Sequence, residues 1–323
     1  MKDFAGRIAV VTGGGSGMGR ELVRQLVAEG CNVAMCDVSM APLLETKALC
    51  EQARIPQGTR ITAHVADVSD EAGMLRFRDE IATRQDTDRI HLLFNNAGIG
   101  GGGSMIANTR TEWERTFNIC WGGVYLGCRI FLPMLLKADA GHIVNTSSIN
   151  GTWASIGPNV PHTAYAAAKF AVKGFSEALI TDLRINAPHI RVSVVMPGHI
   201  GTGIVANSRK IQAGSESDDI SDVEIAQARA RIASTGADVS ALSDADIKAK
   251  MLERAQNFLT QAPMSAAEAA TVILDGVKAD RWRILVGADA AEIDRRIRTT
   301  PERAYDLDFF EELASQIGWR LGA

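Results

Sequence analysis

The sequence has few cysteines, no long apolar run and no cluster of basic residues. The cysteines form no C-x-x-C pair and no Cys/His group with zinc spacing; they are Cys31, Cys36, Cys50, Cys120 and Cys128. This pattern is typical of reduced, mostly buried thiols in a reducing compartment, and no metal site is expected. The sequence therefore predicts neither a disulfide-stabilised fold nor a zinc-binding domain.

The other absences narrow the class of protein further. No apolar run reaches the ~18 residues that a membrane-spanning helix needs, and the N-terminal MKDFAGRIAVVTGG lacks a signal-peptide pattern. The net charge is −4 without a basic run, which argues against nucleic acid as a main partner. A globular cytoplasmic protein is expected, with neither membrane nor nucleic acid as a partner.

The first forty residues follow a strand, turn, helix, strand pattern. Arg7–Thr12 predicts a buried strand, a glycine-rich turn covers residues 13–19, and an amphipathic helix is expected over Arg20–Glu29. Glycines let the backbone approach a pyrophosphate, and a helix N-terminus directs free N–H groups at it. This pattern indicates a dinucleotide phosphate site, with a plain tight turn as the alternative.

The second expected strand, Asn32–Asp37, ends in an acid 18 residues after Gly19. A carboxylate at this point accepts hydrogen bonds from the adenosine ribose hydroxyls of NAD. It would repel the 2′-phosphate of NADP, and Ser16 and Val38 offer that phosphate no positive charge. The sequence therefore predicts NAD as cofactor.

Two further expected strands, Arg60–Ala66 and Ile90–Phe94, alternate with helices. Such a series predicts an α/β fold, a doubly wound parallel sheet of Rossmann type. The carboxyl ends of its strands line the ligand crevice. The residues expected there are Asp67, Val68, Asn95 and Ala97.

A helix beginning near Tyr165 carries Y-A-A-A-K, residues 165–169. The four-residue spacing places Tyr165 and Lys169 on one helix face, with Cβ atoms about 5–6 Å apart. An ammonium beside a phenol is expected to lower the pKa of the phenol, which then exchanges a proton with an alkoxide or alcohol. The alternative is that a tyrosine and a lysine four residues apart occur on this helix by chance.

Together these motifs resemble the short-chain dehydrogenase/reductase family in its ordinary single-domain form. The resemblance covers about residues 5–205, with a weaker similarity at 265–290. It is carried by Thr12–Gly19, Asp67-Val68, N-N-A-G (95–98), I-V-N-T-S-S (143–148), Y-A-A-A-K (165–169) and P-G-H-I-G-T (197–202).

The resemblance implies seven strands and a catalytic set of Ser148, Tyr165 and Lys169, with Ser147 as the nearest rival of Ser148. Ser148 would hold the substrate oxygen, Tyr165 would exchange its proton, and Lys169 would bind the nicotinamide ribose. The implied cofactor contacts are Gly13, Ser16, Gly17, Met18, Gly19, Asp37, Asp67, Val68, Asn95, Ala97, Tyr165, Lys169, Pro197, Gly198, Ile200 and Thr202.

The sequence departs from the family pattern in two places. Ser148 and Tyr165 are 17 residues apart, a few more than usual, and Trp153 and Val160 in this segment are pocket walls or surface-packing residues. Cys120 stands where the family has an asparagine that holds a water near the lysine. Asn118 replaces that asparagine only if the helix is irregular there. His199 is expected to be a loop or packing residue.

Residues 203–263 exceed the family's usual substrate loop. Val223–Ala233 and Ala245–Leu259 have helical periodicity, and Ser243 with Asp246 and Ser265 with Glu268 resemble capping boxes. We expect one domain over 1–323, with a substrate lid at about 203–263; a peripheral oligomer contact is the alternative. The tail at about 296–323, with Phe309, Phe310 and Trp319, is expected to pack on a neighbouring subunit or the lid.

The sequence thus predicts an NAD-dependent dehydrogenase of a secondary alcohol, or reductase of the ketone. With no evident Arg or Lys clamp in the loops, a bulky apolar substrate is expected, such as a hydroxysteroid or an alicyclic or aryl alcohol. A 3-oxoacyl thioester reductase and a non-catalytic dinucleotide-sensing scaffold are the alternatives. By analogy with the family, the chain is expected to form a homotetramer or homodimer.

Overall fold

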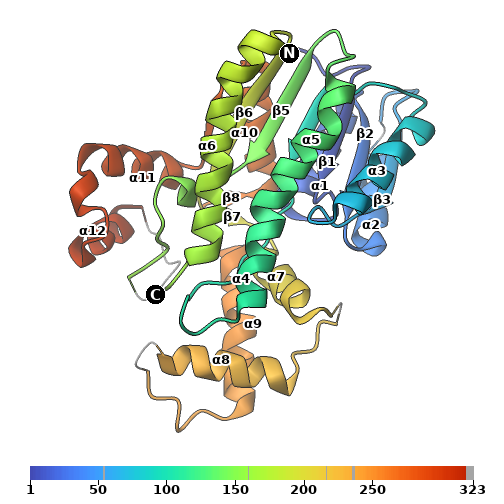
Figure 1. Cartoon of the computed structure of the whole chain (residues 1–323). Helices are drawn as coiled ribbons and strands as arrows, with labels where there is room; N and C mark the ends of the chain where they lie inside the picture. Colours follow the sequence, from blue (N-terminus) through green and yellow to red (C-terminus); the bar gives the residue numbers. More distant parts are fainter. Residues whose placement is uncertain (54, 159, 216, 235–236, 318–323) are drawn as a thin grey trace.

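The computed structural model describes residues 1–323 except 54, 159, 216, 235–236 and 318–323 (Figure 1). Seven parallel strands form one sheet in the order β3-β2-β1-β4-β5-β6-β9. The strands are β1 (Ile8–Thr12), β2 (Asn32–Asp37), β3 (Ile61–Val65), β4 (Leu92–Asn95), β5 (Gly141–Thr146), β6 (Ile190–Pro197) and β9 (Arg283–Val286). The predicted doubly wound parallel sheet is confirmed.

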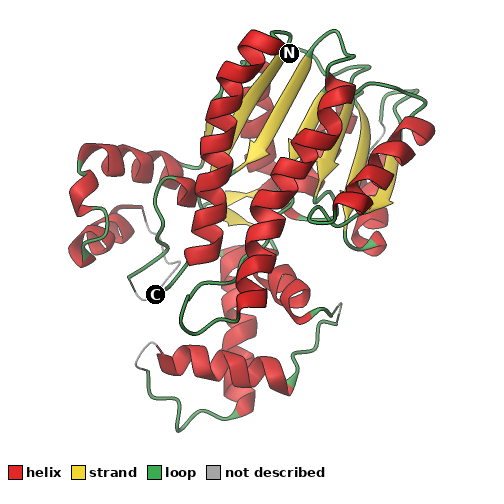
Figure 2. Cartoon of the chain, in the orientation of Figure 1, coloured by secondary structure: helices red, strands yellow, loops and turns green. Residues whose placement is uncertain are grey.

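Helices cover both faces of the sheet (Figure 2). Alternate residues of β1 enter different cores: Ala9 and Val11 pack with α1, α2 and α10, whereas Val10 packs with α3, α5 and α6. Every residue of β1 is buried, as expected for a strand with both faces covered. These helices are α1 (Gly17–Ala28), α2 (Met40–Gln52), α10 (Ala266–Lys278), α3 (Glu71–Arg84), α5 (Gly123–Leu135) and α6 (Thr163–Asn186). All five cysteines are free and buried.

The segment 203–263 lies outside the seven-stranded sheet and is bounded by a separate two-stranded sheet. Two short strands, β7 (Ile200–Gly201) and β8 (Met264–Ser265), pair in parallel and close its base. Between them lie α7 (Ile204–Ala213), α8 (Asp222–Ser234) and α9 (Asp244–Thr260). The two expected helices and both capping boxes are confirmed, while α7 was not predicted. Figure 1 places α7–α9 beyond the carboxyl ends of the strands, beside α4 (Arg110–Phe117).

The C-terminal helices α11 (Ala288–Thr299) and α12 (Leu307–Ile317) pack on their own chain. Trp153 is 1% exposed and lies among Ile293, Phe309 and Leu313. Its indole N–H donates to the Ala304 carbonyl at 2.6 Å. The expectation that this tail packs on the lid is therefore wrong, because its buried residues cover Trp153, which is a core residue. Trp319 lies outside the described residues.

No helix within the described ranges is both long enough and apolar enough to cross a bilayer.

One buried histidine makes the fold sensitive to acid. The Ser193 hydroxyl donates its proton to the Arg281 carbonyl at 2.6 Å, so His142 Nε2, 2.8 Å from Ser193 Oγ, must be the donor in that pair. His142 Nδ1 has no hydrogen-bond partner among the described residues. Burial, aided by the N-terminal ammonium and Arg191, lowers the pKa of His142 to about 3.

We predict that stability falls with acidification in a way that His142→Gln reduces. The unfolded histidine binds its proton near pH 6.5, whereas the folded one binds it near pH 3, so stability is lost as the pH falls through this window. Between pH 7 and pH 5 the wild type should lose about 2 kcal/mol more than His142→Gln. Urea unfolding at both pH values measures this, and parallel losses would contradict the assignment.

Candidate active site

Ser148, Tyr165 and Lys169 come together where β5 ends and α6 begins. Lys169 Nζ donates to the Thr146 carbonyl at 2.8 Å and lies 5.4 Å from the centroid of the Tyr165 ring. The helical spacing of Tyr165 and Lys169 therefore places the two side chains against each other, as expected. Ser148 follows β5, and its hydroxyl is near enough to the phenol of Tyr165 to act on the pKa of that phenol.

The two adjacent serines have different surroundings. Ser147 is 1% exposed, and its hydroxyl donates to the Lys169 carbonyl at 2.7 Å, which fastens β5 to α6. The Ser148 hydroxyl instead faces Tyr165 and lies 3.5 Å from the Pro197 carbonyl. Of the two serines, only Ser148 is placed to share a substrate oxygen with Tyr165.

Burial dominates the electrostatics of the pair. It raises the pKa of Tyr165, as does the nearby Cys120, while the hydrogen bond with Ser148 acts in the opposite direction. Burial also lowers the pKa of Lys169. The expected lowering of the phenol's pKa by Lys169 is therefore wrong for the chain's own residues. The ammonium points at the Thr146 carbonyl, and desolvation of the phenolate outweighs its charge.

The helix is irregular at the position of the missing asparagine. Residues Asn118–Gly122 form a π-helical turn between α4 and α5. Asn118 is nevertheless exposed, whereas Cys120 is fully buried and its thiol donates to the Ile99 carbonyl at 3.2 Å. A Cβ on Gly98 would lie 3.5 Å from Lys169 Nζ and 3.6 Å from Cys120 Sγ. The structure therefore places Cys120, and not Asn118, beside the lysine.

The glycine turn before α1 fits a pyrophosphate. Gly13 and Gly17 have φ of 69° and 53°, and a Cβ on Gly19 would lie 2.0 Å from the Gly13 carbonyl oxygen. Ser16, at the N-cap of α1, makes no side-chain capping bond, so its helix N–H groups remain available to an anion. Met18, in the first turn of α1, is partly buried. Thr202 reaches this turn, 3.3 Å from a Cβ built on Gly17.

Asp37 is fixed at the end of β2 by two backbone N–H groups, Gly15 at 3.0 Å and Val38 at 2.8 Å. Burial raises the pKa of its carboxyl, and these N–H groups oppose the shift. Sequence reasoning overlooked one cation at this turn: Arg20 donates to the Gly15 carbonyl at 2.7 Å. Its charge is paired with Glu45 at 2.6 Å.

Among the residues that follow β3 and β4, Asp67 and Ala97 border the crevice, whereas Val68 lies in the core. Asp67 accepts the Ser69 N–H at 2.9 Å, and the Ala97 N–H donates to Thr12 at 3.1 Å. Val68 packs on α5, 2.6 Å from a Cβ built on Gly123.

The side chain of Asn95 lies in the core, so the expected cofactor contact does not come from that side chain. Its amide donates to Asn145 Oδ1 at 2.8 Å, and a Cβ on Gly127 would lie 2.1 Å from its oxygen. Only its backbone is left for the crevice, because the amide group has turned toward α5 and Asn145.

The loop after β6 connects the site to the segment 203–263. Ile200 is buried, and Gly198 lies against Asp289, whose Oδ2 accepts the His199 N–H at 2.6 Å. The His199 ring contacts Phe258 of α9, and its Nε2 lies 2.8 Å from the Phe258 carbonyl. His199 is therefore a packing residue, as expected, and it holds α9 against the loop that begins with Pro197.

Two residues of the site were not identified from the sequence. His162 lies against Tyr165, with ring centroids 4.7 Å apart. Burial and the charge of Arg254, on α9, lower the pKa of His162 to about 4. His162 precedes the first residue of α6, and its spacing of three residues from Tyr165 could have indicated the first contact. No pattern in the sequence could place Arg254.

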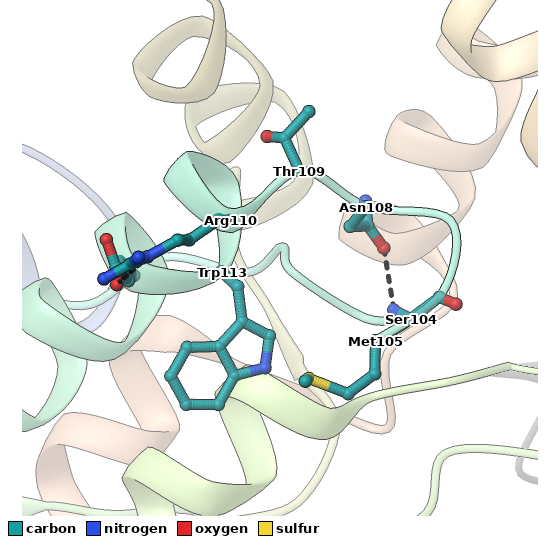
Figure 3. A pocket seen from close by; sticks show the side chains of 7 residues that line it. Ser104, Met105, Asn108, Thr109, Arg110 and Trp113 are labelled. Carbon is teal, nitrogen blue, oxygen red and sulfur yellow. Dashed lines mark hydrogen bonds and ion pairs between the residues drawn. The ribbon is translucent and has the colours of Figure 1, made fainter.

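A separate hollow of about 430 Å³ lies at the start of α4 (Figure 3). Its lining includes Met105, Thr109 and Trp113, but none of Ser148, Tyr165 and Lys169. It borders the site through Trp113, whose indole N–H donates to Thr163 at 3.1 Å. The hollow is therefore separate from the cluster of Ser148, Tyr165 and Lys169.

The fold and the site together define a dinucleotide-dependent oxidoreductase. A family model described as short chain dehydrogenase matches residues 7–213. The chain belongs to the short-chain dehydrogenase family and is an oxidoreductase that binds a nicotinamide dinucleotide.

Named relatives are about a third identical to the chain over some 200 aligned residues. A putative oxidoreductase SadH of Mycobacterium tuberculosis is 34% identical over 210 residues, 64% of this chain and 72% of the relative. Levodione reductase of Leifsonia aquatica is 36% identical over 208 residues, 64% and 74%. A 3-alpha-(or 20-beta)-hydroxysteroid dehydrogenase of Mycobacterium bovis is 34% identical over 197 residues, 61% and 70%.

Among similar solved structures, one covers nearly the whole chain. A short chain dehydrogenase/reductase from Burkholderia phymatum in complex with NAD has a TM-score of 0.74 at 26% identity, covering 94% of this chain and 96% of that one. A metagenomic short-chain oxidoreductase in complex with NADP has a TM-score of 0.53 at 29% identity, covering 60% and 82%.

We predict that Gly19→Ala abolishes dinucleotide binding. Its Cβ would collide with the Gly13 carbonyl, which belongs to the phosphate turn itself. Gly174→Ala is the matched control, because a Cβ there meets nothing within 4 Å and Gly174 lies inside α6. Calorimetric titration with NAD should show binding in wild type and Gly174→Ala alone. Equal affinity in Gly19→Ala would show that the dinucleotide does not use this turn.

Proposed function

We propose that the chain transfers hydride between NAD and a secondary alcohol or its ketone. The observation that carries the proposal is the convergence of Ser148, Tyr165 and Lys169 at the carboxyl end of the sheet, with a glycine cradle at the same end. The nicotinamide supplies or accepts the hydride when bound.

In this proposal the chain's own residues hold the substrate oxygen and move one proton. Ser148 donates a hydrogen bond to that oxygen, and Tyr165 donates its proton as the ketone becomes an alkoxide. Burial keeps the phenol protonated at neutral pH, the form that reduction needs. Lys169, anchored on the Thr146 carbonyl, holds a positive charge beside the phenol and reaches the nicotinamide ribose.

We assign NAD rather than NADP on the contacts of Asp37. Its carboxylate is held at the end of β2, where it accepts bonds from ribose hydroxyls and repels a 2′-phosphate. Arg20 supplies no free charge for that phosphate because Glu45 pairs with it at 2.6 Å. The Burkholderia phymatum relative in complex with NAD supports this assignment.

The substrate in this proposal has a bulky apolar body. Relatives named levodione reductase and hydroxysteroid dehydrogenase act on cyclic compounds of this kind, which supports an alicyclic or steroid-like framework here.

We propose that residues 203–263 act as a lid over this substrate. α7 contacts the phosphate turn through Asn207, which donates to Ser16 at 3.1 Å. It also contacts the loop after β4 through Ser208, which accepts the Gly100 N–H at 2.8 Å. A segment tied to both sides of the crevice is suited to closing over it.

Tyr125 and Phe170, exposed on α5 and α6, support a homodimer or homotetramer.

Tyr165→Phe should abolish turnover while leaving NAD binding intact. The phenyl ring keeps the packing against His162 but has no proton to donate. We expect kcat to fall by about a thousandfold or more. A panel of secondary alcohols from cyclohexanol to steroids, read at the absorbance of reduced nicotinamide, measures this. Cys120→Ala should lose much less, since a thiol is a weak donor; an equal loss would make Cys120 essential.

Asp37→Ser should change the cofactor preference. Loss of the carboxylate removes charged hydrogen bonds to the ribose, so kcat/KM with NAD should fall by about 10- to 100-fold. Removal of the repulsion should raise kcat/KM with NADP, and Glu45→Gln in the same chain should raise it further by releasing Arg20. An unchanged NAD to NADP ratio in both variants would refute the assignment.

A further inference from the structure

One face of α9 packs on other parts of the chain near both of its ends. Ile247, Met251, Arg254 and Phe258 follow one another at spacings of four, three and four residues, which places them on one side of a helix. Ile247 is fully buried and packs with Met251 in the small core shared with α8. Phe258 contacts the His199 ring, with centroids 4.5 Å apart. Arg254 therefore lies on the face that is anchored at both ends.

Arg254 lies one helical turn before Phe258, which packs on the His199 ring in the loop after β6. The Arg254 charge acts on His162, and the His162 ring is in contact with Tyr165. Arg254 is exposed to solvent, and neighbouring protein atoms partly desolvate its guanidinium, which lowers the pKa of that group. A guanidinium on the helix face that is anchored beside the site, and open to solvent, is accessible to a small molecule that enters there.

Arg254 also differs from its cationic neighbours in having no counter-charge. Arg231 pairs with Glu112 at 3.3 Å and Arg209 with Glu224 at 2.8 Å. Within the described part of the chain, no carboxylate oxygen lies within 4.0 Å of the guanidinium nitrogens of Arg254. The Arg254 side chain makes no hydrogen bond to these residues either. Its recognised charge neighbour is Arg231, which repels it. A crowded guanidinium without a carboxylate is stabilised by an anion that arrives from solution.

We propose that the substrate carries an anionic group, a carboxylate or a phosphate ester, which Arg254 binds while the reacting carbon lies at Tyr165. The inference rests on the proposed function and makes it more specific: an apolar body bears a negative charge at the end facing α9. Arg254 lies on a helix of the segment 203–263, so the inference adds a cation that the expectation of loops without an arginine clamp did not consider.

The chemistry of arginine explains why this residue would set specificity. Its planar guanidinium donates two parallel hydrogen bonds to a carboxylate or phosphate. A neutral substrate of the same shape leaves those donors without a partner in a crowded setting, which disfavours it. Segment 203–263 would then select the substrate as well as cover it.

The test compares anionic and neutral probes of one shape on the protein saturated with NAD. Cyclohexanecarboxylate and cyclohexyl phosphate distinguish the two sources of charge, and cyclohexanecarboxamide is the neutral probe. Calorimetric binding is measured for the wild type, Arg254→Gln, Arg254→Lys and Lys248→Gln. Lys248 is the matched control, a cation on the same helix about 120° round its axis from Arg254.

We expect the wild type to bind one of the anions more tightly than the amide. Arg254→Gln should lower that affinity by about 10- to 100-fold, Arg254→Lys should recover part of it, and Lys248→Gln should change it less than threefold. Affinity for the amide should stay the same in all four proteins. Equal binding of anion and amide by the wild type, or equal losses in Arg254→Gln and Lys248→Gln, would overturn the inference.

Turnover separates this inference from the proposed function. On 4-oxocyclohexanecarboxylate and its methyl ester, Arg254→Gln should lose kcat/KM for the acid and keep it for the ester, whereas Tyr165→Phe should lose both. Selective anion binding without hydride transfer to any ketone would contradict the proposed function alone. Hydride transfer that ignores the charge in every variant would contradict the inference alone.

Discussion

Two hydrogen bonds of one residue fix the position of α6 against β5, and the site depends on them. The Lys169 carbonyl accepts the Ser147 hydroxyl at 2.7 Å, and Lys169 Nζ donates to the Thr146 carbonyl at 2.8 Å. The approach is so close that a Cβ on Gly151 would lie 2.7 Å from the Lys169 carbonyl oxygen. With this register set, Tyr165 lies one turn earlier on the helix, where its phenol meets Ser148.

The same burial sets the chemistry of the site. Desolvation raises the pKa of Tyr165 and lowers that of Lys169, so the surroundings favour a protonated phenol and weaken the charge on the amine. Charges that enter such a setting interact more strongly than they would in water. Arg254 on α9 is the cation that we propose binds the anionic group of the substrate.

The sequence predicted those features that depend on local spacing. The parallel strands, the glycine cradle, both capping boxes and the juxtaposition of Tyr165 with Lys169 follow from short patterns, and the structure contains each of them. The choice of Ser148 over Ser147 came from the family resemblance. Its physical reason, the bond between Ser147 and the Lys169 carbonyl, became visible only in the tertiary structure.

The features that could not be predicted depend on packing between distant segments. Trp153 is covered by residues about 150 positions further along the chain, and nothing near it in sequence indicates this. The Asn95 amide turns into the core because Asn145 accepts its hydrogen bond. The expected effect of Lys169 on Tyr165 failed because spacing gives proximity but not burial. His199 holds α9, and Arg254 with it, against the loop after β6 through a contact between residues 59 positions apart.

The central claim is that a hydride passes between the nicotinamide and a carbon whose oxygen shares its proton with Tyr165. The most direct measurement uses NADH carrying deuterium at both positions of C4, so that the transferred hydride is labelled whichever face reacts. The acceptor is a cyclic ketone, and the product alcohol is analysed by mass spectrometry. The account predicts one deuterium on the carbinol carbon with the wild type and no labelled alcohol with Tyr165→Phe. An alcohol formed by the wild type without deuterium, or a labelled alcohol formed equally well by Tyr165→Phe, would contradict it.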